Sequence, residues 1–135
     1  MNPLGLLAAT TTFLAIWLGH VSVRKIEFAS PTIWKPATVF AMFGIFLESL
    51  SLFATNRALS VLFGIAGISL LWDALEFIRQ QKRIMLGHAP ANPKNARHRK
   101  IMAEYSSATT VDLLKRDPTG GLASLEEAAS VTEHQ

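Results

Sequence analysis

Hydrophobic residues run almost without interruption through three segments of the chain. Residues 2–23 contain no charged side chain, residues 36–56 contain only Glu48, and residues 58–78 stay uncharged until Asp73. A helix needs about 20 predominantly apolar residues to cross the ~30 Å hydrocarbon core of a bilayer, and helices of soluble proteins are seldom apolar on every side. The pattern therefore predicts three transmembrane helices over these ranges.

Most charged residues lie after the third apolar segment, where only a minority of positions are apolar. The third apolar segment continues as a polar helical sequence that we expect to end before Gly87. We therefore divide the chain into a transmembrane domain of residues 1–86 and a basic tail of residues 87–135. A loose helical face over residues 101–114 predicts a tail that is partly helical or disordered. The expected fold class is all-α, with the three spans in a small bundle.

The distribution of basic residues predicts the orientation of the spans. Loops that are rich in Lys and Arg stay on the cytoplasmic side of a membrane. With three spans, the first connection and the tail share one side and carry all the basic residues except Arg57. The N-terminus is thus expected outside and the tail in the cytoplasm. Trp17, Trp34 and Trp72 all fall at the expected cytoplasmic boundary, where an interfacial aromatic belt forms.

Small residues form a stripe along each predicted span. In lipid, apolar bulk does not favour a neighbouring helix over a lipid tail, so small residues that allow close backbone approach mark the packing faces. The stripes predict a compact bundle, with self-association through one stripe as the alternative. Their members are Gly5, Ala8, Thr12, Ala15 and Gly19; Ala37, Ala41, Gly44, Glu48 and Ser51; and Ser60, Gly64, Gly67, Leu71 and Ala74.

Glu48 is the one ionisable residue well inside the expected hydrocarbon layer. An uncompensated charge there costs at least about 2.5 kcal/mol, so such a residue is a candidate functional group. At ~1.5 Å per residue, Glu48 lies at the depth of Thr12 and Gly67, and a layer of these three residues is expected. Glu48 is interpreted first as a structural hydrogen-bonding residue that donates to a threonine hydroxyl or a backbone carbonyl. A proton- or ion-handling role and contact with another subunit are the alternatives.

A second polar cluster is expected at the inner boundary. His20 and Arg24 share one helical face, as do Asp73 and Glu76, and the antiparallel order of the spans brings both pairs to one depth. Ion pairs between the first and third spans are expected there. A metal site of His20, Asp73 and Glu76 and a pocket for a quinone or a lipid headgroup are alternatives. The complete cluster is His20, Arg24, Lys25, Glu27, Asp73 and Glu76.

Basic residues continue past the third span into the tail. Such a juxtamembrane run more often binds anionic headgroups than nucleic acid, so no nucleic-acid partner is expected. We predict that these residues contact the bilayer surface or a docking partner. They are Arg79, Lys82, Arg83, Lys94, Arg97, Arg99 and Lys100.

The inner-boundary residues resemble a family of small bacterial three-span membrane proteins that is known as a domain of unknown function. The resemblance covers about residues 1–95 and places the protein in a bacterial inner membrane. Val21 departs from the family pattern, which favours proline after the histidine. The matching residues are His20, Val23, Lys25, Glu27 and Phe28 at the end of the first span, and Trp72, Glu76, Lys82, Arg83, Gly87, Asn92, Pro93 and Lys94 after the third.

No motif in the chain indicates a reaction. There is no nucleotide-binding loop, no catalytic-triad composition and no redox-metal signature, and the absence of cysteine excludes thiolate metal sites. We expect no enzyme activity and no cofactor. The sequence favours a small membrane subunit that packs against a larger integral complex and docks through its basic tail. The alternatives are a homo-oligomeric transporter or channel component that uses Glu48, and a module that binds a lipid or quinone headgroup at the inner boundary.

Overall fold

The structure, a computed structural model, describes residues 3–113, and within this range every regular element is a helix. The elements are α1 (Pro3–Ala29), α2 (Trp34–Phe53), α3 (Arg57–Met85) and α4 (Ala96–Glu104). Helices α1, α2 and α3 are each long and apolar enough to cross a membrane, which confirms the predicted all-α class with three candidate spans. The orientation across the membrane stays a prediction. Asn2, the predicted start of the first span, and residues 114–135 lie outside the described residues.

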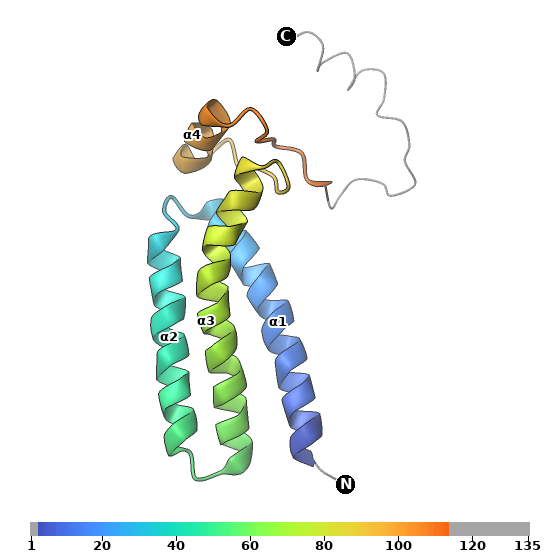
Figure 1. The fold of residues 1–135 in the computed structure, drawn as a ribbon, viewed down its shortest axis with the longest axis vertical. Helices are drawn as coiled ribbons and strands as arrows, with labels where there is room; N and C mark the ends of the chain where they lie inside the picture. Colours follow the sequence, from blue (N-terminus) through green and yellow to red (C-terminus); the bar gives the residue numbers. More distant parts are fainter. Residues whose placement is uncertain (1–2, 114–135) are drawn as a thin grey trace, which may run out of the picture.

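Helix α3 is the central element of the transmembrane domain. It packs along both α2 and α1, which lie on opposite sides of it (Figure 1). The three helices converge at the end near α4, where Val23, Ala37 and Phe77 form a buried cluster. Toward its N-terminus α1 leans away from α3 (Figure 1), and a Cβ added at Gly5 would have no neighbour within 4 Å. The small-residue stripe of α1 therefore meets α3 only along part of its length.

The α2–α3 interface depends on glycines and on a reciprocal pair of serines. A Cβ at Gly44 would lie 2.9 Å from the carbonyl oxygen of Gly67, so only glycine allows the two backbones to approach this closely. Nearer the connection, the Ser51 hydroxyl donates to the Ser60 carbonyl at 2.8 Å, and the Ser60 hydroxyl donates to the Ser51 carbonyl at 2.9 Å. In lipid, close packing and interhelical hydrogen bonds of this kind are what hold helices together.

The boundaries of α3 follow from its end residues. Asn56 caps the start, because its side-chain oxygen accepts hydrogen bonds from the backbone N–H groups of Ala58 and Leu59 at 2.8 and 3.4 Å. At the other end Gly87 has φ +72°, a left-handed conformation that glycine adopts without strain. The His88 N–H then donates to the Arg83 carbonyl at 2.8 Å, as in helices that end on a left-handed residue. The predicted end of the third helix before Gly87 is confirmed.

After α3 the chain forms a small folded unit, residues 86–113, which we refer to as the head. Its core consists of Ala89, Ala91 and Ile101 packed against Ile84 of α3. The predicted helical face over residues 101–114 is wrong in its bounds, because α4 begins at Ala96, after the N-cap Asn95, and ends at Glu104. Leu114 lies outside the described range.

The segment that follows α4 leaves the helical conformation because its polar groups bond to other parts of the head and to α3. The Ser107 hydroxyl donates to the Met85 carbonyl at 2.5 Å, and the Ala91 N–H donates to the Thr109 carbonyl at 2.8 Å. Through these bonds, the segment after α4 lies beside the loop that precedes α4. The head is thus a compact cap on the end of α3.

The close approach of α2 and α3 makes a testable prediction for Gly44→Ala. The added methyl group would press on the Gly67 carbonyl and on Leu71 Cγ, 2.8 Å away, so we expect a loss of about 1–3 kcal/mol of unfolding free energy. Gly5→Ala is the matched control, since its methyl group meets nothing within 4 Å. Unfolding in detergent micelles measures both. Equal stability of the two variants would contradict the proposed tight interface.

Candidate functional site

Glu27 lies at the centre of the contacts that hold the head on α1. Its side chain is only 1% exposed, and its Oε1 accepts hydrogen bonds from Arg97 Nη2 at 2.7 Å and from His98 Nε2 at 3.2 Å. Arg97 Nη2 also donates to the Glu27 carbonyl at 2.8 Å, where the negative end of the α1 dipole favours a cation. Burial of a carboxylate requires a partner of this kind. The ion pair therefore joins α4 to the last turns of α1.

His98 links the same carboxylate to the loop before α4. The ring is completely buried, and its Nδ1 accepts a hydrogen bond from the Asn92 backbone N–H at 2.8 Å. This bond assigns the ring proton to Nε2, which donates to Glu27. Arg97 Nη2 and His98 Nε2 lie 2.9 Å apart because both converge on one carboxylate oxygen. His98 thus connects three segments through one side chain.

Two asparagines satisfy the carbonyl groups at the end of α1. The last carbonyls of a helix have no donor within the helix. Here the Phe28 carbonyl accepts from Asn92 Nδ2 at 3.0 Å and from Asn95 Nδ2 at 3.2 Å, and the Ser30 carbonyl accepts from Asn95 Nδ2 at 2.8 Å. The residues that fasten the head to α1 in this way are named the clamp. They are Glu27, Asn92, Asn95, Arg97 and His98.

The predicted inner-boundary cluster divides into separate groups. The expected ion pairs between first-span cations and third-span carboxylates are wrong for Glu76, which pairs within α3 with Arg83 at 2.6 Å and Arg79 at 3.4 Å. These arginines follow Glu76 on the same helical face, so they reach it without crossing to another helix. Asp73 is buried against Gly19 of α1, with His20 close enough to interact electrostatically.

The alternative of a metal site at His20, Asp73 and Glu76 receives no support. Within residues 3–113 no three His, Asp or Glu side chains are placed to hold a metal ion together. His20 Nδ1 lies 3.1 Å from the Ile16 carbonyl of its own helix, and the side chain is exposed.

Glu48 lies in the α2–α3 interface, half-buried against Gly67. The expected layer of Thr12, Glu48 and Gly67 is wrong for Thr12, whose hydroxyl donates to the Ala8 carbonyl of its own helix at 2.8 Å. The reason is the position of α1, which lies across α3 from α2 (Figure 1). The described part of the chain offers Glu48 no hydrogen bond, so its structural hydrogen-bonding role stays a prediction.

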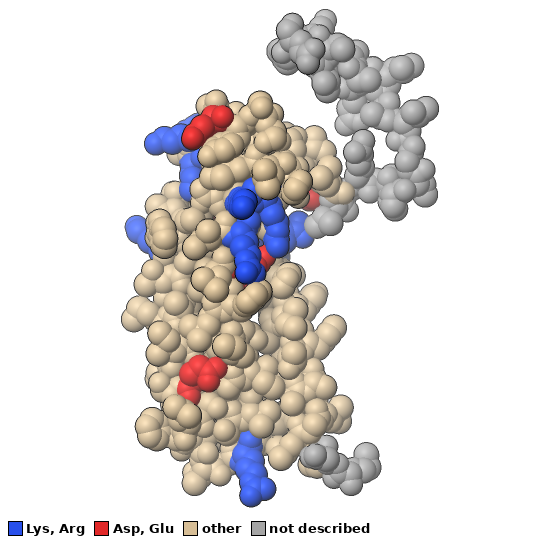
Figure 2. Space-filling view, in the orientation of Figure 1, with Lys and Arg blue, Asp and Glu red and all other residues tan. Residues whose placement is uncertain are grey.

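One member of the predicted basic surface lies inside the protein, and the docking role of the others stays a prediction. Arg97 is 14% exposed and directed inward to Glu27, so it does not reach a headgroup or a partner. Lys94, Arg99 and Lys100 are exposed on the head. Figure 2 shows basic side chains around the head and the adjoining helix ends, next to a largely uncharged body. The remaining members are Lys82, which is exposed, and Arg79 and Arg83, which are half-exposed and paired with Glu76.

The three tryptophans predicted as an aromatic belt are all more than half exposed. Trp72 additionally lies under the Arg79 guanidinium, whose central carbon is 4.4 Å from the ring centroid. Such a cation–π contact fixes a basic side chain at the surface of the helix. Trp17 and Trp34 present their rings outward from α1 and α2, in the manner that an interfacial position requires.

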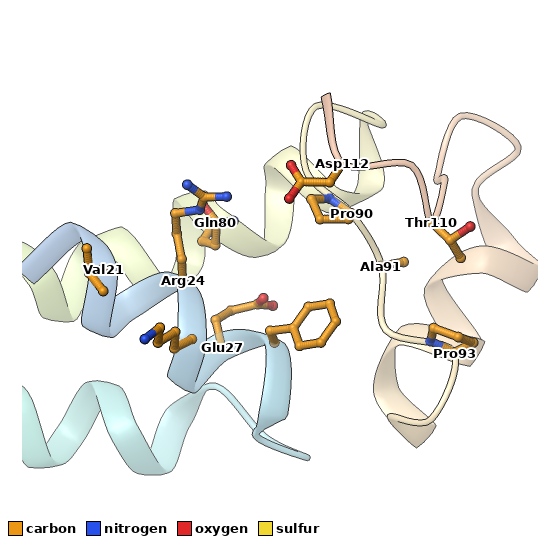
Figure 3. Close-up of a pocket in the computed structure, with 11 residues that line it drawn as sticks. Val21, Arg24, Glu27, Gln80, Pro90, Ala91, Pro93, Thr110 and Asp112 are labelled. Atoms are coloured by element: carbon orange, nitrogen blue, oxygen red, sulfur yellow. The ribbon is translucent and has the colours of Figure 1, made fainter. Parts of the chain in front are cut away.

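A pocket of about 640 Å³ lies between α1, α3 and the head (Figure 3). Helix α1 supplies Arg24 and Lys25 to its wall, α3 supplies Gln80, and the head supplies Pro90 and Ala91. The sequence indicated a headgroup pocket only as an alternative at this level, and the wall from the head was missed. Those residues come from a loop whose path no local pattern specifies.

The clamp predicts a large effect for Arg97→Met, which keeps the length of the side chain and removes its charge. Glu27 would then be a buried charge without its cation, a change that costs about 3–5 kcal/mol in other proteins. We expect a loss of unfolding free energy of this size. Adding Glu27→Gln should recover much of it, because the uncompensated charge is then absent.

Arg99→Met is the matched control, since Arg99 lies on the exposed face of the same helix. Denaturant titration of the purified protein in detergent compares the three variants. If Arg97→Met and Arg99→Met lowered the stability equally, the ion pair would not be what fixes the head.

Comparison with known proteins gives a family and no function. No curated protein and no solved structure matches the chain. The family described as a domain of unknown function, DUF4491, matches residues 2–95, a range that covers α1, α2, α3 and the loop up to the residue before α4. The match covers well over half of the 135 residues. The chain therefore belongs to the DUF4491 family.

Proposed function

We propose that the protein is a small, non-catalytic membrane subunit whose head is a fixed basic docking surface for an acidic face of a larger membrane complex. One observation carries this proposal: the buried Glu27–Arg97 ion pair holds the head in one place on the transmembrane domain. A tail that merely trails from the membrane needs no buried ion pair. A docking surface benefits from one, because a rigid surface loses less conformational entropy when a partner binds.

The charges that remain outside the clamp support a docking role. With Arg97 directed inward, Lys94, Arg99 and Lys100 remain exposed on a short stretch of the head. Three cations against the exposed Glu104 of α4 leave this stretch with an excess of positive charge. Such an excess speeds the encounter with a surface of opposite charge and fixes its orientation. An acidic partner surface at the membrane is therefore the complement that the head fits.

The transmembrane domain offers a second surface to the same complex. The N-terminal half of α1 leans away from α3 (Figure 1), and Gly5 and Thr12 of its small-residue stripe are exposed. Small residues allow another helix to approach closely. A helix of the larger complex that packs here would cover the part of the α1 stripe that α3 leaves exposed.

The other functions that we considered have less support. The transporter alternative places Glu48 on a path between protomers, and neither the pocket beside the head nor the hollow on α1 is lined by this carboxylate. His98 and Glu27 form a histidine–carboxylate pair such as enzymes use for proton transfer. However, His98 is completely buried and both its ring nitrogens are engaged, so it is not in reach of a substrate proton.

Gentle detergent extraction followed by native mass spectrometry tests the proposed role. We expect the wild-type protein in one heavier assembly of fixed stoichiometry. The double variant Arg99→Glu and Lys100→Glu reverses the charge of the docking surface and should release the protein from that assembly, whereas Arg57→Glu, at the opposite end of α3, should not. Recovery of the wild-type protein only alone, or only with copies of itself, would refute the proposal.

A further inference from the structure

The pocket beside the clamp has a basic wall. Arg24 lines it from α1 (Figure 3). Lys25 lines it from the same helix, and both side chains are exposed. Glu27 also contributes to the wall, but its carboxylate is paired with Arg97. Asp112 adds a single negative charge from the head. The two cations of α1 therefore outweigh the acidic groups, and the pocket suits an anion.

Gln80 adds a hydrogen-bond donor to the same pocket. The residue is 5% exposed, and its Oε1 accepts a hydrogen bond from Arg83 Nη1 at 3.0 Å. This bond assigns the side-chain nitrogen to the other side of the amide. No acceptor for that nitrogen is found among residues 3–113, and the nitrogen is not among the side-chain atoms that are fully buried without a partner. It is therefore open to the pocket and free to donate to an oxygen atom of a bound anion.

A second, apolar hollow, referred to as the groove, lies on the part of α1 that precedes Arg24. Phe13, Ile16, Trp17 and His20 line a hollow of about 320 Å³ on the surface of the helix. Because His20 and Arg24 are four residues apart, they lie one above the other on the same helical face. The groove therefore leads along α1 to the basic wall. A ligand that fills both sites has an anionic end and an apolar end.

We propose that the pocket and the groove together bind one anionic phospholipid, with the phosphate between Arg24, Lys25 and Gln80 and an acyl chain along the groove. The location favours a lipid over a soluble anion, because the groove lies on a helix that is long and apolar enough to cross a membrane. The site is independent of the docking role proposed above, which uses Lys94, Arg99 and Lys100.

Native mass spectrometry of the purified protein with added lipid tests this site. The probes are phosphatidylglycerol and phosphatidylcholine with identical acyl chains, so that only the charge of the headgroup differs. We expect the wild-type protein to retain one phosphatidylglycerol molecule in preference to phosphatidylcholine. Arg24→Gln should weaken its binding about tenfold or more, as expected for the loss of one charged hydrogen bond.

Two further variants keep the test decisive. Gln80→Glu retains an acceptor for Arg83 but replaces the N–H donor with a negative charge, so it should also weaken phosphatidylglycerol binding. Lys35→Gln is the matched control, since Lys35 is an exposed cation at the start of α2 and does not line the pocket. It should bind the lipid as the wild type does.

Three results would overturn the proposal. The first is equal retention of the two lipids by the wild-type protein. The second is unchanged phosphatidylglycerol binding in both Arg24→Gln and Gln80→Glu. The third is displacement of the lipid by millimolar inorganic phosphate, which would show that the pocket takes a soluble anion. Because none of these variants changes the exposed basic residues of the head, failure here leaves the docking proposal standing.

Discussion

The buried carboxylate of Glu27 is the constraint on which the rest of the head depends. A charge at the end of an apolar helix is tolerated only where a cation and hydrogen-bond donors surround it. Here these come from Arg97 and His98, 70 and 71 residues away along the chain. The ion pair matters beyond any net stability that it adds, because it ties α4 to the last turns of α1. It thereby fixes the position of the exposed basic surface and of one wall of the pocket.

In lipid, apolar burial does not determine which transmembrane helices pack together. Helices α2 and α3 pack closely because Gly44 allows contact with a backbone carbonyl and because Ser51 and Ser60 exchange hydrogen bonds. Helix α1 has the same kind of small-residue stripe, yet it is held at one end only, by the clamp and the packing near Gly19. Its N-terminal half thus remains available to a helix of the proposed complex. Its outer face remains available to the acyl chain of the proposed lipid.

Hydropathy and end signals predicted the three long helices and the end of α3 at Gly87, because these depend on local composition and on backbone conformation. The partner of Glu27 was not predictable in this way. Antiparallel order suggested Asp73 and Glu76 as the acidic partners of first-span cations, whereas Arg79 and Arg83 already reach Glu76 along α3. In the sequence, Arg97 could not be distinguished from Arg99 and Lys100, the other cations of the same basic run. The spacing of His98 and Ile101 could have indicated the inner face of α4. The two residues are three apart in the sequence, and both are buried.

The central claim, that the ion pair fixes the head on the transmembrane domain, is tested most directly by a distance between α2 and α4. The chain contains no cysteine, so Thr38→Cys and Ala103→Cys at exposed positions accept a pair of nitroxide labels without background. Pulsed electron paramagnetic resonance in lipid nanodiscs then measures their separation. The account predicts a single narrow distance distribution that broadens when Arg97→Met is added and stays narrow with Arg99→Met. A distribution already broad with Arg97 in place, or unchanged by its removal, would contradict it.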